Sequence, residues 1–545
     1  MSSDAGSQKV FNVFAKNLTL THTGDNTNAI MVYKGTVNIG TVDNKVGTLT
    51  INGNNIKGEN NDYKGRAIRQ TNGGKVNIYA KNLNIDGYNE AIKVDGSGSL
   101  TLNADEGHIK SDIEAGSSSA GTVNLTLGSG VTLEGSITTK ADSSSSKITL
   151  NGATWNVTGE STVTEIGGTA ANIKVEDAEA ATGWVKVGKV TATNLTVSTE
   201  TTDSNTDETL VALSKVAVDA SDRTKSVAKQ VQLKNAIYDN VVGNVTDNGV
   251  EIAEKQVASA NISVNDMAAI GLMSWRAEMN DMNKRMGELR NANGEHGVWV
   301  RMVRGESEYN SVKNQYNQYQ LGYDEKLSTD PSWTVGVALS YTDAENNFAQ
   351  GNGESTNKAL SIYGSKLNDD GTFVDLIAKY ARLENDFETF SGMGAADYDA
   401  NGYSLSAEFG KRIQQGKGLW IEPQVELTYG RVGSVDYVSE NGVSVAQDSM
   451  DSLVGRIGFS LGKDIEKGNV YARASYLYDF DGETKATLNN DAVLKNDLGG
   501  GWWEVGVGAN INLSKATYIY ADVEKTFGGE VDTNWQWNLG VRYSF

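Results

Sequence analysis

The chain of 545 residues contains no cysteine, only two prolines and only three histidines. Without cysteine it can form no disulfide, no zinc–thiolate site and no catalytic thiol. The histidines (His22, His108 and His296) lie far apart in the sequence, so we expect no histidine-based catalytic cluster, no metal site and no cofactor. The scarcity of proline beside 60 glycines excludes a proline-rich or collagen-like chain.

Basic charge and long apolar runs are also scarce. The formal net charge is −21, which argues against nucleic acid as a partner. No stretch approaches the roughly 18 apolar residues of a membrane-spanning helix, so a helical membrane protein is excluded, whereas a β-barrel is not. The first eight residues lack the apolar core of a secretory signal, which an exported barrel needs, and we expect that signal upstream of Ser2.

Aromatic residues divide the chain into two architectures. Eight of the ten tryptophans follow residue 270, whereas the first 250 residues are rich in Gly, Asn, Thr, Ser and Val. We predict an N-terminal domain over residues 1–255, a linker with an α-helix over 256–295, and a C-terminal domain over 296–545. The expected fold class is all-β.

The N-terminal domain is repetitive. Short alternating runs recur, each bounded by Gly or Asn, which is typical of strands. The pairs Ala67-Ile68 and Ala91-Ile92 lie 24 residues apart and precede similar runs at Val76 and Leu100. This period predicts a right-handed parallel β-helix, in which neighbouring coils bury one another's inward side chains. An antiparallel sandwich is the alternative.

The C-terminal domain contains twelve segments of alternating polarity from about residue 296 onward. In the last segment one face carries Trp535, Trp537, Leu539, Val541, Tyr543 and Phe545. An even number of long strands with terminal aromatics predicts a 12-stranded antiparallel transmembrane β-barrel that contacts outer-membrane lipid. A soluble barrel would place its apolar face inside, and twelve strands would leave that interior hard to fill.

The last eight residues resemble the C-terminal assembly signal of outer-membrane proteins. The matching positions are Asn538, Gly540, Tyr543 and Phe545. With the repetitive N-terminal half, the chain resembles a monomeric type Va autotransporter. That resemblance implies a barrel in the bacterial outer membrane, assembled by the barrel-assembly machinery and periplasmic chaperones, and a β-helical passenger at the cell surface or outside the cell.

The linker predicts a helix over residues 263–290. Ser263 and Asp266 suit its start, and Met279, Met282, Met286 and Leu289 recur at helical spacing. An amphipathic helix packed on some surface would give the same periodicity.

The segment 278–290 is similar to the linker of the serine-protease autotransporters of enterobacteria. In that family the helix threads the barrel pore and is cut between two asparagines, the first of which cyclises. The resemblance implies that Asn280 would be the cyclising residue, and Asp281 stands where the family has the second asparagine.

Such a reaction needs acidic groups that orient the amide and assist proton transfer. The strand pattern places four carboxylates and one candidate electrostatic partner in the lumen: Asp375, Glu408, Glu422, Glu426 and Arg473. Solvated charges lining a pore would show the same pattern.

Three functions follow from these observations. The first is transport and display of an adhesin-like passenger that binds host or neighbouring-cell surface ligands. The second is an autotransporter with a glycan-degrading or protease passenger, although residues 1–255 contain neither Gly-Asp-Ser-Gly nor Gly-x-Ser-x-Gly. The third is a channel in which the barrel itself is the working unit.

Overall fold

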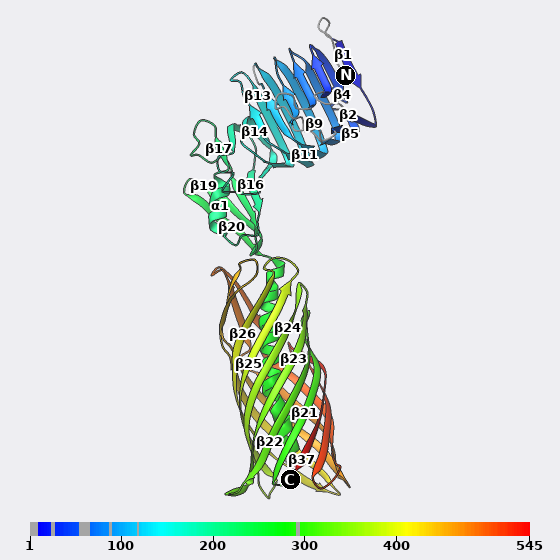
Figure 1. Cartoon of the computed structure of the whole chain (residues 1–545), viewed down its shortest axis with the longest axis vertical. Coiled ribbons are helices and arrows are strands. Elements are labelled where there is room, and N and C mark those ends of the chain that lie inside the picture. The colour runs from blue at the N-terminus through cyan, green and yellow to red at the C-terminus, as the bar shows by residue number, and fades with distance from the viewer. Residues whose placement is uncertain (1–8, 23–27, 54–65, 87–89, 117–118, 290–294) are drawn as a thin grey trace. The chain divides into compact units, whose positions relative to one another are not determined.

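The computed structural model describes residues 9–22, 28–53, 66–86, 90–116, 119–289 and 295–545. They belong to two compact units, Met1–Gln256 and Val257–Phe545 (Figure 1). In this described part of the chain, no helix combines the length and apolar character that a membrane crossing requires.

The N-terminal unit is a stack of parallel coils built from short strands. The strands are β1 (Lys9–Val13), β2 (Asn17–His22), β3 (Asn28–Tyr33), β4 (Gly35–Ile39), β5 (Val46–Gly53), β6 (Arg66–Thr71), β7 (Lys75–Asp86), β8 (Glu90–Val94), β9 (Gly98–Lys110), β10 (Asp112–Ala115), β11 (Gly121–Glu134), β12 (Ile137–Thr139), β13 (Ser145–Asn156), β14 (Ser161–Lys174), β15 (Val185–Val190), β16 (Leu195–Glu200), β17 (Ala217–Asp219), β18 (Gln230–Lys234), β19 (Tyr238–Thr246) and β20 (Gly249–Val257). Strands of successive coils pair in parallel, as between β7 and β9, and β9 and β11. The predicted parallel β-helix is confirmed, and the antiparallel sandwich is wrong for this region.

Columns of apolar side chains form the core of the coils. Ile68, Ile92, Ile113 and Ile137 are register partners in successive coils, and each is at most 1% exposed. Burial of one such side chain contributes about 1.5–3 kcal/mol, and each depends on the coils on both sides of it. The inward orientation that the 24-residue spacing predicts for Ile92 is therefore confirmed.

One buried carboxylate links three coils of this unit. Glu114 forms an ion pair of 2.7 Å with Lys93 and another with Lys140. Burial alone would raise the pKa of Glu114, but the hydrogen bonds and charges of Lys140 and Lys93 outweigh it and hold the pKa below its ordinary value of 4.5. The ionised form of Glu114 therefore favours the folded coils.

Helix α1 (Thr206–Ser214) lies between β16 and β17. Parallel pairing continues after this helix, since β17 pairs with β15 and β18 pairs with β16. It ends at β18, which pairs antiparallel with β19, and β19 in turn pairs with β20.

The C-terminal unit is a closed antiparallel barrel (Figure 1). Its strands are β21 (His296–Tyr309), β22 (Val312–Leu327), β23 (Asp330–Phe348), β24 (Gly351–Leu367), β25 (Thr372–Thr389), β26 (Ala395–Lys411), β28 (Leu419–Val432), β31 (Met450–Ile465), β32 (Gly468–Asp479), β35 (Gly500–Asn512), β36 (Thr517–Phe527) and β37 (Asp532–Ser544). The short β27 (Ile413–Gly416) pairs only with β28. Pairing of β21 with β37 and of β26 with β28 closes the ring, which confirms the predicted 12-stranded barrel.

The outer face of the barrel is apolar. Alternating exposure along the strands leaves side chains such as Leu339 and Leu405 59% and 64% exposed, whereas their sequence neighbours are buried in the lumen. A surface of this kind suits lipid rather than water, because a water-soluble protein rarely leaves so large an apolar surface uncovered.

Two connections between barrel strands form a small second sheet. It consists of β29 (Val435–Val438), β30 (Ser444–Gln447), β33 (Glu483–Leu488) and β34 (Ala492–Asp497), in that order. The unit also contains the short 3-10 helix η1 (Ser259–Asn261) and the long helix α2 (Ile262–Leu289), which runs inside the barrel (Figure 1).

Candidate functional site

Helix α2 is packed in the barrel lumen, as the resemblance of the linker to that of the serine-protease autotransporters implies. Its apolar side chains Met267, Ile270, Trp275 and Met279 are at most 4% exposed. The helix mixes apolar residues with charged and polar ones, so the lumen wall must supply partners for both kinds of side chain. Asn280 and Asp281 continue the helix, but their side chains lie outside the described residues.

Two glycines of the wall let the helix approach closely. A β-carbon on Gly402 would lie 2.8 Å from a ring carbon of Trp275, and one on Gly430 would lie 2.6 Å from Trp275 Nε1 and still closer to the sulfur of Met279. Real carbon atoms keep about 3.5–4.0 Å apart, so a side chain at either position would displace the helix. Gly402 on β26 and Gly430 on β28 thus form a seat for Trp275 and Met279, which we call the glycine seat.

On β22 to β25 the wall holds α2 through a buried polar network around Glu278. The carboxylate of Glu278 accepts hydrogen bonds from Gln318 Nε2 at 3.0 Å and Thr342 Oγ1 at 2.5 Å. Lys379 Nζ lies 3.1 Å from Glu278 Oε2 and also donates a hydrogen bond to the backbone carbonyl oxygen of Glu278. Both charged side chains are about 1% exposed, so the pair is fully removed from solvent.

Two further contacts fix α2 closer to its N-terminus. Arg276 Nη2 lies 2.5 Å from Asp479 Oδ2, and Asp479 also accepts a hydrogen bond from Ser452. Asn265 Nδ2 donates a hydrogen bond to Asn496 Oδ1, and Asn496 Nδ2 donates one to the backbone carbonyl oxygen of Asn265, which ties the helix to β34 of the small sheet. These contacts all involve residues that precede Asn280.

The structure places three of the predicted carboxylates side by side. Asp375, Glu408 and Glu426 are register partners across β25, β26 and β28, and each is less than 10% exposed on the lumen side. Asp375 accepts a hydrogen bond from Ser365 Oγ at 2.5 Å, and Glu426 accepts one from Ser406 Oγ at 2.8 Å.

The other two predicted residues have different partners. Glu422 pairs with Arg412 at 2.6 Å. Arg473 pairs with Asp522 at 3.4 Å and with Glu524 at 2.5 Å.

The cation beside Glu426 is Arg456 rather than Arg473. Arg456 lies 3.4 Å from Glu426 and 3.5 Å from Glu504. The sequence reasoning missed Arg456, as well as Lys379, although both occupy inward positions of alternating strands; the alternation alone does not say which inward residues reach one another.

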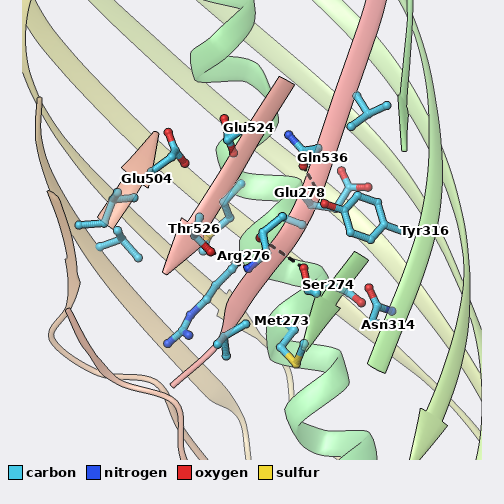
Figure 2. Close-up of a pocket in the computed structure, with 18 of the residues that line it drawn as sticks. Met273, Ser274, Arg276, Glu278, Asn314, Tyr316, Glu504, Glu524, Thr526 and Gln536 are labelled. Atoms are coloured by element: carbon cyan, nitrogen blue, oxygen red, sulfur yellow. Dashed lines mark hydrogen bonds between the residues drawn. The ribbon is translucent and has the colours of Figure 1, made fainter. Parts of the chain in front are cut away.

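A cavity of about 110 Å³ separates α2 from part of the lumen wall. Figure 2 shows Ser274 and Glu278 of the helix together with Glu504 and Glu524 from β35 and β36. Of the predicted site residues that the structure describes, only Glu426 lines this cavity, and Met279 of the helix lines it as well. The cavity therefore gives the helix immediately before Asn280 a polar, acidic neighbour.

The residues of the proposed assembly signal lie on the closing strand β37, except Phe545, which directly follows it. Asn538 is buried in the lumen, whereas Tyr543 and Phe545 are 51% and 63% exposed on the outer face. Gly540 leaves room for the ring of Tyr520, which a β-carbon would overlap. Phe545 stacks on Tyr543 and on His296, with ring centroids 6.3 and 6.1 Å apart, so the last residue contacts both β37 and the first strand of the barrel.

The C-terminal unit is thus a lipid-facing barrel with a helix in its lumen, and the chain that precedes this helix forms a parallel β-helix. Residues 298–524 match the family model described as "Autotransporter beta-domain". The C-terminal unit therefore carries an autotransporter β-domain, a barrel of the bacterial outer membrane.

Several curated proteins are similar to this chain. "Serine protease EspC" of Escherichia coli O127:H6 is 27% identical over 519 residues, which cover 84% of this chain and 39% of EspC. "Pertactin autotransporter" of Bordetella parapertussis is 31% identical over 305 residues, or 53% of this chain and 33% of pertactin. The chain thus spans about two fifths or less of the length of these relatives.

Among solved structures, the translocator domain of NalP from Neisseria meningitidis is similar over 53% of this chain and all of that domain. Its TM-score is 0.44 and its sequence identity is 16%.

Proposed function

We propose that the barrel carries the N-terminal β-helix across the outer membrane and then holds it at the cell surface. The observation that carries this proposal is the burial of α2 in the lumen: the segment that precedes the barrel in sequence occupies the pore that a translocating passenger would use. A channel that works on its own would gain nothing from a lumen filled by a helix. Conductance of the full chain, compared with a variant lacking residues 257–290, tests this alternative, because a working channel would conduct with the helix in place.

We further propose that the passenger is adhesin-like. Its coils carry ladders of polar side chains, such as the hydrogen-bonded row of Asn12, Asn38 and Asn77, with bonds of 2.7 and 2.9 Å. Stacked rows of this kind offer a long, regular surface for ligand contact. Adhesion of cells that display the wild-type chain, against cells that display the barrel with the passenger deleted, is the direct test.

An enzymatic passenger is the second candidate, because relatives such as EspC are named serine proteases. Residues 1–255 contain no Gly-Asp-Ser-Gly, so no trypsin-like nucleophile motif is recognisable in this part of the passenger. Screening the displayed passenger for hydrolysis of proteins and glycans separates the two, since an adhesin gives none.

The third part of the proposal is a single self-cleavage of the linker at Asn280. Nδ2 of Asn280 would attack the carbonyl carbon of the same residue, and a new C–N bond closes a five-membered cyclic imide. The peptide bond to Asp281 breaks, and the proton lost from Nδ2 passes through a lumen carboxylate to the nitrogen of Asp281. The passenger then ends in the imide, which water opens, and the barrel fragment begins at Asp281.

The carboxylates proposed for this proton transfer are Glu426, which lines the cavity as Met279 does, and its strand partners Glu408 and Asp375. Glu422 and Arg473 have their own ion-pair partners, so we propose that they contribute only to the electrostatic potential of the lumen.

The test of self-cleavage is the mass of the barrel fragment in a set of variants. Asn280→Gln should block cleavage with barrel assembly intact, because the longer side chain loses the geometry of attack. Asp281→Asn should preserve or accelerate it. Glu426→Gln and Asp375→Asn should slow it, whereas Glu384→Gln, on the outer face, is the matched control. A wild-type chain that stays intact would mean that the passenger remains covalently tethered.

Assembly would involve the barrel-assembly machinery and periplasmic chaperones, with the outward aromatics of β37 as the recognised feature, and we propose a monomeric barrel.

A further inference from the structure

One contact of α2 reaches the helix backbone close to Asn280. Asn496 and Tyr398 also donate hydrogen bonds to helix carbonyls, but at Asn265 and Met267, more than ten residues before Asn280. Lys379 Nζ donates a hydrogen bond to the carbonyl oxygen of Glu278, and the same ammonium lies 3.1 Å from Glu278 Oε2. Lys379 is buried and lies in the middle of β25. Burying a lysine ammonium costs free energy because the charge loses its hydration. Here the neighbouring Glu278 carboxylate balances that charge.

The helical hydrogen bond accepted by the Glu278 carbonyl encloses the peptide bond that the proposed cleavage breaks. In an α-helix the carbonyl of residue i accepts the N–H of residue i+4, so the carbonyl of Glu278 is the acceptor for the N–H of Met282. The peptide bond between Asn280 and Asp281 lies inside that hydrogen-bonded turn, which the helix retains through Leu289. The Lys379 ammonium and the N–H of Met282 therefore both use the Glu278 carbonyl, two residues before Asn280, as their acceptor.

Sharing this acceptor has two physical consequences. A side chain inserted into the helical ladder weakens the local hydrogen bond and eases a bend of the backbone. An asparagine in a regular helix must rotate its backbone before its amide can reach its own carbonyl carbon, so a weakened turn lowers that cost. The charge-assisted bond also fixes the helix in rotation and along the barrel axis, which sets the position of Asn280 against the lumen carboxylates.

We propose that Lys379 is a positioning residue for self-cleavage, acting through the backbone carbonyl of Glu278. This inference rests on the proposed cleavage at Asn280. It differs from a general anchoring role, because the ion pair of Arg276 with Asp479 and the glycine seat hold the helix without touching that carbonyl.

The experiment measures the rate of appearance of the barrel fragment after a pulse of synthesis of the full chain in cells. Lys379→Met should slow cleavage by at least about tenfold, since displacement of reacting groups by about 1 Å costs up to a hundredfold. Lys379→Arg, which keeps a cationic donor, should restore most of the rate. The matched control Lys358→Met removes an outward lysine whose partner is Glu384 on the barrel surface, and should leave the rate unchanged.

Two further variants separate positioning from folding. Glu278→Gln combined with Lys379→Met leaves no unpaired buried charge, and it should assemble into heat-modifiable barrel at wild-type level yet still cleave slowly. Arg276→Met loosens the helix elsewhere and should slow cleavage far less than Lys379→Met.

The outcomes distinguish this inference from the function on which it rests. An uncleaved wild-type chain would overturn both. A wild-type chain that is cleaved, with Lys379→Met cleaved at the same rate or Arg276→Met slowed equally, would overturn the positioning role alone.

Discussion

The glycine seat makes the strongest prediction about how the barrel holds its helix. In Gly430→Ala the new β-carbon would lie 2.6 Å from Trp275 Nε1 and nearer still to the sulfur of Met279, both side chains being buried. The distance to Trp275 Nε1 is about 1 Å shorter than the usual contact distance of about 3.5–4.0 Å, so α2 or the wall must move. Overpacking of this kind costs about 1–3 kcal/mol.

Hydrogen–deuterium exchange of the α2 amides reports this cost directly. Because about 1.4 kcal/mol corresponds to a tenfold change in an equilibrium, local opening of α2 should become roughly 5- to 150-fold more frequent. The barrel strands, which are held by their own hydrogen bonds, should exchange as in the wild type.

The matched control is Gly433→Ala, just beyond the end of β28. A β-carbon there would meet no atom closer than 3.6 Å, and the position has no positive φ. Replacing glycine at such a position stabilises the fold by about 0.4–1 kcal/mol or leaves it unchanged. Equal exchange of α2 in Gly430→Ala and Gly433→Ala would refute the glycine seat.

Three further predictions concern the rest of the chain. Ile92→Asp buries an unpaired charge in the coil core at a cost of roughly several kcal/mol, so protease sensitivity should spread to neighbouring coils, whereas Thr101→Asp on the outer side of β9 should not change it. Because the folded pKa of Glu114 is depressed, its contribution to stability is complete above about pH 4.5 and disappears as the pH falls through the folded pKa; acid unfolding of the passenger should therefore be less steep in Glu114→Gln. Deleting Phe545 removes its stacking on the first strand and should reduce the amount of heat-modifiable barrel in outer membranes, while wild-type levels would contradict the assembly signal.

The sequence was sufficient to predict the periodic parts of the molecule. Alternation along β37 distinguishes the outward Trp535 and Tyr543 from the inward Asn538, and the 24-residue spacing identifies Ile92 as a core residue. Both predictions depend on a local period, which is 2 in a strand and one coil in a β-helix, and such periods are visible without knowledge of contacts.

The contacts of the helix could not be predicted in this way. An inward position on a strand identifies Lys379 and Arg456 as lumen residues, but the strand stagger and the rotation of α2 decide which groups they meet. The same uncertainty led to Arg473 being proposed as the partner of the lumen carboxylates, whereas it pairs with Asp522 and Glu524. The small sheet of β29, β30, β33 and β34 was also missed, because its strands are at most six residues long and lie within apparent loops.

The central claim is that this barrel brings its own β-helix to the outside of the cell. The most direct measurement is protease digestion of intact cells that express the full chain behind an export signal, followed by detection of the passenger and the barrel separately. The account predicts that external protease removes the passenger, in both the wild type and Asn280→Gln, and leaves the barrel intact in the outer membrane. A passenger that stays protected in cells whose barrel is fully assembled would contradict it.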